Sequence, residues 1–214
     1  MISKLIFLVV IGFLSTTSSI YAHPVAYAGS NSIMTWNSQS MSDWMLTHTF
    51  ESTYSLSARY QRIETIEGER TFYIPHLNFL LKRWNELDSQ ANVYLSMGHG
   101  GEKVNHSLKD TSFLAFETDW ESRKYYVSFR EEALMTYKKR ASNLYMSKVR
   151  MGFAPYLAEF NELNSWFILE AIKQNKNKDS FMLTPFVRLF YRNVLVELGV
   201  SQKGESQFNF MIHF

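Results

Sequence analysis

The sequence predicts an all-β protein that forms a closed antiparallel up-and-down barrel of twelve membrane-crossing strands. Three observations predict this fold: an apolar leader, an alternation of apolar and polar side chains, and a regular exchange of short and long connections. The alternation has a period of two, which is the repeat of a β-strand, because successive side chains point to opposite faces. The 214 residues suffice for one domain with its own core.

The first 22 residues have the parts of a secretory signal peptide. Lys4 precedes a ten-residue apolar run at 5–14, and a stretch of small and polar residues follows as far as Ala22. The run is too short to cross a membrane as a helix, which takes about 20 residues. We therefore expect cleavage after Ala22 and a mature domain at 23–214, with a cut after Ala28 as the alternative.

Composition excludes several classes of function. Without cysteine the chain forms no disulfide, thiolate metal site or cysteine nucleophile. Its 22 Lys and Arg nearly balance its 20 Asp and Glu, so no charge excess points to nucleic acid as a partner. No phosphate-binding loop, dinucleotide fingerprint or zinc-protease motif occurs. We therefore expect no cofactor and no enzymatic activity.

Alternating segments recur along the chain. In 54–61 apolar and aromatic side chains at even positions alternate with polar ones at odd positions, and 124–132, 181–192 and 194–200 behave similarly. A strand that crosses a membrane needs about 9–11 residues, apolar outside and polar inside. Strands of soluble proteins are nearer five or six residues. The long segments favour a membrane barrel over the alternative, a soluble periplasmic barrel or sandwich.

The last ten residues carry aromatic side chains at alternate positions. Phe208, Phe210, Ile212 and Phe214 fall on one face of a strand. This segment resembles the assembly signal of bacterial outer-membrane β-barrel proteins, and the resemblance covers these ten residues alone. It implies that the last strand closes the barrel by pairing near Ile33, and that the barrel-assembly machinery binds it. It also implies a location among the outer-membrane lipids of a Gram-negative bacterium.

The connections give the number of strands, because periplasmic turns are short, outer loops are longer and the strand number is even in this class. The expected inner turns are 51–54, 85–88, 120–123, 161–164 and 192–193. The expected outer loops are 37–42, 64–70, 98–110, 138–141, 173–179 and 201–205. Eleven connections make twelve strands with both termini at the periplasmic end.

That count requires 142–160 to be one long strand. Gly152 and Pro155 interrupt it, and we interpret them as a β-bulge. The alternative is a turn at 150–155, which would give thirteen strands and reverse the direction of the loop 98–110.

The polar face of the strands predicts what lines the lumen. It carries eight basic side chains, five acidic ones and two histidines. They are Arg59, His76, Lys82, Glu117, Asp119, Lys124, Arg130, Glu132, Lys148, Arg150, Glu170, Arg188, Arg192, Glu197 and His213. Because lumen charges tune selectivity, we expect a narrow channel for passive passage of small solutes or ions, with a weak preference for anions.

Three alternatives to a channel stay open. One is a structural or adhesive barrel with a filled lumen, whose loop 98–110 meets a partner. A second is a lipid-modifying enzyme of the outer membrane, for which His99, His106, Ser107 and Asp110 supply the residue types. The third is a copper-related exported protein. The sequence leaves the oligomeric state open.

The copper alternative depends on His23. Cleavage after Ala22 would make it the first residue, whose amine and imidazole can bind copper together. Met34, Met41 and Met45 add thioether ligands nearby, although methionine also serves as packing filler.

Tryptophans mark the expected ends of the strands. Trp36, Trp44, Trp84, Trp120 and Trp166 all lie within a few residues of such an end. This placement predicts girdles at the two membrane interfaces, where an apolar ring with a polar N–H meets the headgroups.

Overall fold

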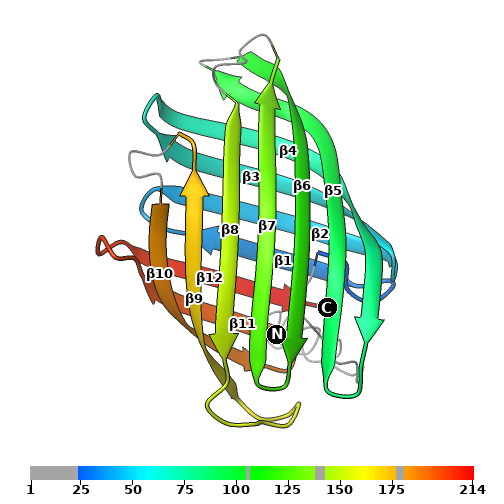
Figure 1. Cartoon of the computed structure of the whole chain (residues 1–214). Helices are drawn as coiled ribbons and strands as arrows, with labels where there is room; N and C mark the ends of the chain where they lie inside the picture. The colour runs from blue at the N-terminus through cyan, green and yellow to red at the C-terminus, as the bar shows by residue number, and fades with distance from the viewer. Residues whose placement is uncertain (1–23, 105–106, 138–142, 177–180) are drawn as a thin grey trace, which may run out of the picture.

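The computed structural model describes residues 24–104, 107–137, 143–176 and 181–214, which form a closed barrel of twelve antiparallel strands (Figure 1). Each strand pairs with its neighbours in the chain, and the first pairs with the last. The strands are β1 (Asn31–Asn37), β2 (Met41–Glu51), β3 (Tyr54–Thr65), β4 (Gly68–Asn85), β5 (Ser89–Val104), β6 (Ser107–Ser122), β7 (Tyr125–Thr136), β8 (Leu144–Phe153), β9 (Asn164–Gln174), β10 (Phe181–Tyr191), β11 (Val194–Val200) and β12 (Ser206–His213). The predicted fold and strand number are confirmed.

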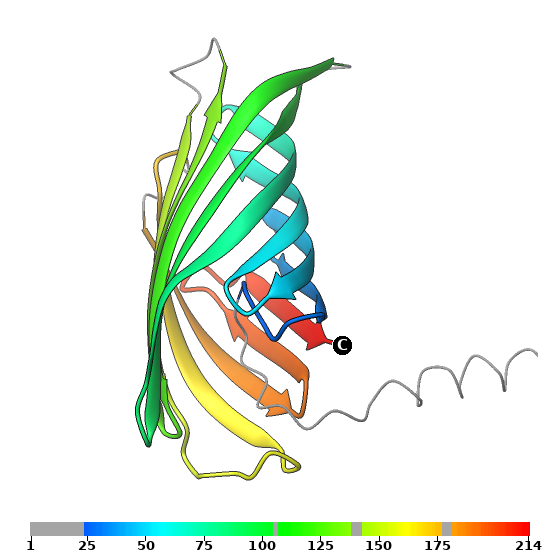
Figure 2. The same ribbon diagram turned by 90° about the vertical axis from the view of Figure 1, so that its right-hand side faces the viewer.

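The two walls of the barrel run in different directions. In Figure 1, β5 to β8 stand nearly upright, while β1, β2 and β12 cross behind them obliquely. Figure 2 shows the same two walls from the side, where they diverge toward one end. Among the described residues, no helix is long and apolar enough to cross a membrane.

The seam of the barrel lies between β1 and β12. Ile33 pairs with Ile212 in register, as the sequence predicts. Asn31 and Phe214 exchange two backbone hydrogen bonds, at 2.7 and 2.8 Å. Inside the barrel, Ser32 Oγ and His213 Nδ1 are hydrogen-bonded at 2.6 Å, and both side chains are buried.

The expectation of one bulged strand over 142–160 is wrong. β8 ends at Phe153, and residues 154–163 form a ten-residue connection to β9. Ala154 N still donates to Lys124 O at 2.9 Å, but Pro155 has no N–H with which to continue the ladder. The strand number stays at twelve because this single connection takes the place of the expected inner turn at 161–164. One inner turn is therefore long.

The expected outer loop 98–110 is also wrong. β5 and β6 stay paired as far as Val104 and Ser107. Gly98 and Gly100 lie within β5, at positions where the backbone of β4 approaches closely. A Cβ atom at Gly98 would overlap the carbonyl oxygen of Pro75, and one at Gly100 would overlap that of Tyr73. These glycines therefore serve a close backbone approach rather than a flexible loop.

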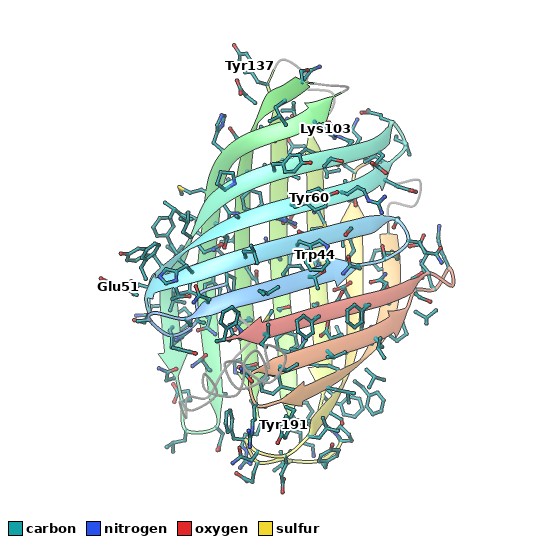
Figure 3. The ribbon with its side chains drawn as sticks, turned by 180° about the vertical axis from the view of Figure 1, so that it is seen from behind. Trp44, Glu51, Tyr60, Lys103, Tyr137 and Tyr191 are labelled. Carbon is teal, nitrogen blue, oxygen red and sulfur yellow. The ribbon has the colours of Figure 1, made fainter. Side chains whose placement is uncertain are left out.

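The outer face of the barrel is apolar and aromatic. Trp44 and Tyr60, with other aromatic side chains, point away from the barrel in Figure 3. Trp44, Trp84 and Trp120 are between 41 and 48% exposed, as interfacial side chains would be. The girdle prediction is wrong for Trp36 and Trp166, which are half-buried and face inward.

We predict that Gly98→Ala lowers the free energy of unfolding by about 1–3 kcal/mol, because the added methyl group meets backbone that cannot move aside. Urea titration of the refolded protein in detergent measures it. Gly101→Ala is the control, since its Cβ would lie 3.2 Å from the flexible side chain of Leu108. Equal losses in the two variants would contradict this explanation.

We predict that deletion of Phe214 lowers the amount of folded protein in the outer membrane, because it removes the last outward aromatic residue of the proposed assembly signal. Gels run with and without boiling report the folded fraction. Phe181→Ala is the control, as Phe181 is also an outward aromatic residue and is 48% exposed. Unchanged, heat-modifiable protein after the deletion would remove the assembly role.

Candidate functional site

The barrel interior holds two ion-pair centres that join opposite walls. In the first, Arg59 of β3 donates from Nε to Asp43 Oδ1 of β2 and from Nη1 to Glu132 Oε1 of β7, each at 2.9 Å. β3 and β7 are not neighbours in the sheet, so this guanidinium spans the lumen. All three side chains are nearly inaccessible to solvent, with exposures of 3 to 6%.

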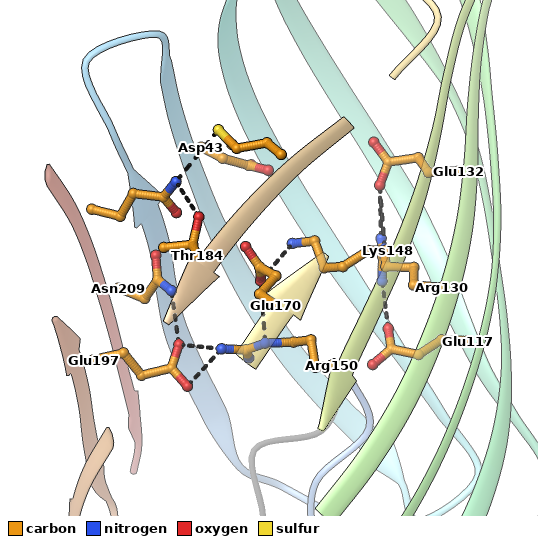
Figure 4. A network of polar contacts seen from close by, with 12 residues as sticks. Asp43, Glu117, Arg130, Glu132, Lys148, Arg150, Glu170, Thr184, Glu197 and Asn209 are labelled. Carbon is orange, nitrogen blue, oxygen red and sulfur yellow. Dashed lines mark hydrogen bonds and ion pairs between the residues drawn. The ribbon is translucent and has the colours of Figure 1, made fainter. Parts of the chain in front are cut away.

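The second centre is built around Glu197 of β11, which is 1% exposed. Arg150 Nη2 of β8 lies 2.9 and 2.8 Å from its two carboxylate oxygens, and Arg188 Nε of β10 donates at 2.7 Å. Asn209 Nδ2 of β12 donates a further bond at 2.7 Å (Figure 4). Since β8 and β11 are not adjacent, this centre too crosses the interior.

Other ion pairs extend these centres. Arg130 lies 2.6 Å from Glu117 and 3.0 Å from Glu132 (Figure 4). Glu170 lies 3.1 Å from Arg150 and 3.8 Å from Lys148. We call the whole set the lumen network; it has five basic and five acidic members, namely Arg59, Arg130, Lys148, Arg150, Arg188, Asp43, Glu117, Glu132, Glu170 and Glu197. Its formal charges cancel, as buried charges require.

Most of the predicted lining residues face the interior. Buried or half-buried on the inner face are Arg59, His76, Glu117, Asp119, Arg130, Glu132, Lys148, Arg150, Glu170, Arg188, Glu197 and His213. Asp119 accepts a hydrogen bond from Asn92 Nδ2 at 2.7 Å, and His76 packs edge-on against Phe113. These two side chains lie outside the lumen network.

Three predicted lining residues do not face the interior. A β-bulge between Leu80 and Lys82 shifts the alternation, so Lys82 is exposed and lies over the ring of Trp84. Lys124 and Arg192 are exposed in tight turns, and Arg192 has a φ of 52° there. All three are basic. Without them the predicted lining has as many basic as acidic side chains, so the charge excess behind the expected anion preference is absent.

Sequence reasoning missed several interior charges. Asp43 alternates in phase with Met41 and Met45, so the period of two in β2 could have found it. Arg83 takes the inward position that the bulge denies to Lys82, and donates to Asn92 Oδ1 at 2.7 Å. Arg70 and Glu102 form a buried pair at 2.8 Å. Glu102 lies in the segment predicted as the loop 98–110, so the alternation could not show which face it occupies. Four further interior charges thus follow from the correct strand limits.

Three cavities follow one another along the interior. A central cavity of about 100 Å³ is lined by the lumen network, except for Glu170. An inner vestibule of about 490 Å³, near the turn 86–88, shares Tyr126, Arg188 and Leu195 with the central cavity. An outer cavity of about 30 Å³ shares Met41 and Met146 with it. Of these three cavities, the one of largest volume therefore lies at the inner end and the smallest lies toward the outer loops.

One side of the interior is apolar rather than polar. Toward the outer end, Phe72, Ile74 and Phe113 pack with neighbouring side chains into a buried cluster. The other members are Ile63, Ala115, Leu134 and Leu144. This cluster fills part of the barrel, so the space that is left runs beside the lumen network.

The residues of the lipid-enzyme and copper alternatives are only partly described. His23 and His106 lie outside the described residues. His99 lies on the outer face, with its Nδ1 3.4 Å from Ser112 Oγ of the adjacent strand rather than beside Ser107. Asp110 is exposed on the same face. In the described part of the chain, no group of three His, Asp or Glu side chains is placed to hold a metal ion.

We predict that Glu197→Gln lowers the free energy of unfolding by about 3–5 kcal/mol, because it leaves Arg150 and Arg188 buried without their shared carboxylate. Urea unfolding in detergent tests this. Glu159→Gln is the control: Glu159 pairs with Arg123 at 3.0 Å, but these side chains are 79 and 57% exposed. Similar stability of both variants would show that the central pairs contribute little.

Comparisons with known proteins place the fold. No family model matches the sequence, and no curated protein sequence matches it. A solved structure described as the KdgM porin in complex with disordered oligogalacturonate is similar at 12% identity and a TM-score of 0.51, over 86% of this chain and 98% of that one. A second KdgM porin structure has 12% identity over the same shares and a TM-score of 0.47. A loop L8 deletion mutant of OmpT, an outer-membrane protein of Vibrio cholerae, has 8% identity and a TM-score of 0.35 over 86% of this chain and 97% of that one. The first of these similarities shows that the chain shares the fold of a protein described as a porin.

Proposed function

We propose that the protein is a narrow outer-membrane channel for the passive passage of ions or small solutes. The arrangement that supports this most directly is the series of three cavities past a charged network. A closed sheet with an apolar outer face suits a membrane, because every strand is paired on both sides and no edge is left. The shared fold with a structure described as a porin is consistent with this proposal.

The cavity sizes limit what can pass. A site for one water molecule takes about 10–15 Å³, so the outer cavity of about 30 Å³ has room for very few water molecules. Ions with part of their hydration shell, and the smallest polar solutes, are therefore the proposed cargo. Because the lumen network is neutral, we propose little intrinsic preference between cations and anions.

The location and the partners belong to the same proposal. We propose that outer-membrane lipids cover the exposed apolar face and that the barrel-assembly machinery inserts the chain after export. Both are consistent with the apolar leader at 1–22 and with the outward aromatic residues Phe208 and Phe214.

A filled structural or adhesive barrel is the second candidate. The apolar cluster around Phe72 and Phe113 and the small outer cavity favour it, because together they leave only a thin path toward the outer loops. Conductance distinguishes the two candidates: a channel gives discrete current steps in a planar bilayer, and a filled barrel of confirmed folding gives none.

We predict that Lys148→Gln shifts ion preference toward cations. Lys148 lines the central cavity, and its ion pair with Glu170 is long, at 3.8 Å, so the change disturbs packing little. Removing one charge about 8 Å from a passing ion alters its energy by about 0.5 kcal/mol in a water-filled path, or about twofold in relative permeability.

The reversal potential across a potassium chloride gradient measures this shift. Lys124→Gln is the matched control, since Lys124 is exposed in a turn away from the central cavity. Steps that are equally selective in both variants and in the original chain would exclude passage beside the lumen network. The absence of steps in folded protein would favour the filled barrel.

A further inference from the structure

Methionine is concentrated inside the barrel, on the two sides of the central cavity. Six methionines face inward: Met34, Met41, Met45, Met146, Met182 and Met211. Three others, Met97, Met135 and Met151, face outward. A thioether sulfur is a soft ligand that carries no charge, so it binds soft metal ions and gives little to hard ones.

Three of the inward methionines form a row across the seam. Met34 of β1 lies opposite Met45 of β2 and also opposite Met211 of β12, so the three occupy consecutive strands at one level. Side chains directly opposite each other have Cβ atoms about 4.5–5.5 Å apart. All three are buried, with 2, 7 and 7% of their surface exposed, and they pack in one cluster with Leu195. We call them the thioether trio.

The trio is reached through the cavities. Met45 and Met211 line the central cavity, and so do Met41 and Met146. Met41 and Met146 also line the outer cavity, together with Met182. Thioethers therefore line the smallest of the three cavities and occur again at the trio.

We propose that the thioether trio binds a soft monovalent cation, Cu⁺ or Ag⁺, inside the barrel. The three sulfurs supply the ligands, and the ion arrives through the cavity lined by Met41 and Met146. Neutral thioethers bind a soft ion by donation from sulfur, and the surrounding lumen network has no net charge that would repel a cation. The inference goes beyond passive conduction, since equilibrium binding requires no passage across the membrane.

The ligand set also selects against other ions. Mg²⁺ and Ca²⁺ take oxygen ligands, and the nearby carboxylates Asp43 and Glu197 are already held by Arg59, Arg150 and Arg188. Zn²⁺ takes nitrogen, oxygen or thiolate ligands, and the chain has no cysteine. A site of thioethers alone is the kind that selects Cu⁺.

Titration with silver nitrate tests the proposal. The full chain, refolded in detergent in chloride-free nitrate buffer, is titrated with Ag⁺ in a calorimeter. The triple variant M34L/M45L/M211L removes the sulfurs while nearly conserving volume, which usually costs less than about 1.5 kcal/mol of stability for each change. We expect at least a tenfold weaker Ag⁺ affinity in this variant, with the original chain binding one additional ion.

The matched control is M97L/M135L/M151L, which removes the outward sulfurs. It should keep the Ag⁺ affinity of the original chain. Heat-modifiability on gels confirms folding of each variant, and the single change M34L at the centre of the row serves if the triple variant fails to fold. X-ray absorption of the silver-loaded chain should show sulfur ligands that M34L/M45L/M211L lacks.

Equal affinity in the original chain and the inner variant would overturn the proposal. So would an equal loss in the control variant, or a silver site without sulfur ligands. Histidine can also bind Ag⁺, so only the difference between the variants measures the trio. The absence of conductance steps would refute the proposed channel without altering any of these results.

Discussion

Backbone hydrogen bonding in a medium without water is the constraint on which this structure depends. Within the hydrocarbon of a membrane each unpaired N–H or C=O costs several kcal/mol, so a sheet must close on itself. Closure by β1 and β12 then divides every strand into an outward and an inward face. The outward face is apolar, as a lipid-facing surface would be, while the inward face carries charges that are shielded from bulk water. Buried charges are tolerated only when they are paired. Arg59 pairs with Glu132 across the lumen, and Glu197 pairs with Arg150.

The period of two made the fold predictable, and local departures from it account for the errors. In β3, β10 and β12 the alternation runs without interruption, and the predicted lining residues Arg59, Arg188 and His213 face inward. At Leu80 and Lys82 one extra residue reverses the phase, and a bulge of this kind leaves no sign in the order of apolar residues. Gly98 and Gly100 resemble loop residues for the same reason that they fit a crowded strand: they lack a Cβ.

The sequence predicts which residues face the interior better than it predicts which of their charged side chains pair. The alternation shows that Arg59 and Glu132 both face inward, but they lie 73 residues apart on strands that are not adjacent. Which charges meet depends on the tilt and stagger of the strands, and these are properties of the closed barrel. The inward tryptophans show the same limit. Trp36 and Trp166 sit near strand ends, as girdle residues do, but only their phase distinguishes an inward ring from an outward one.

The seam has a consequence for how the chain folds. Ser32 and His213 are hydrogen-bonded although 181 residues separate them, so the last contact to form joins the two extremes of the barrel. Every other pairing of strands is a hairpin between consecutive segments and can form locally. Until the seam closes, the molecule is an open sheet with two bare edges, and either edge can pair with a foreign strand. During folding, closure of the barrel therefore competes with aggregation.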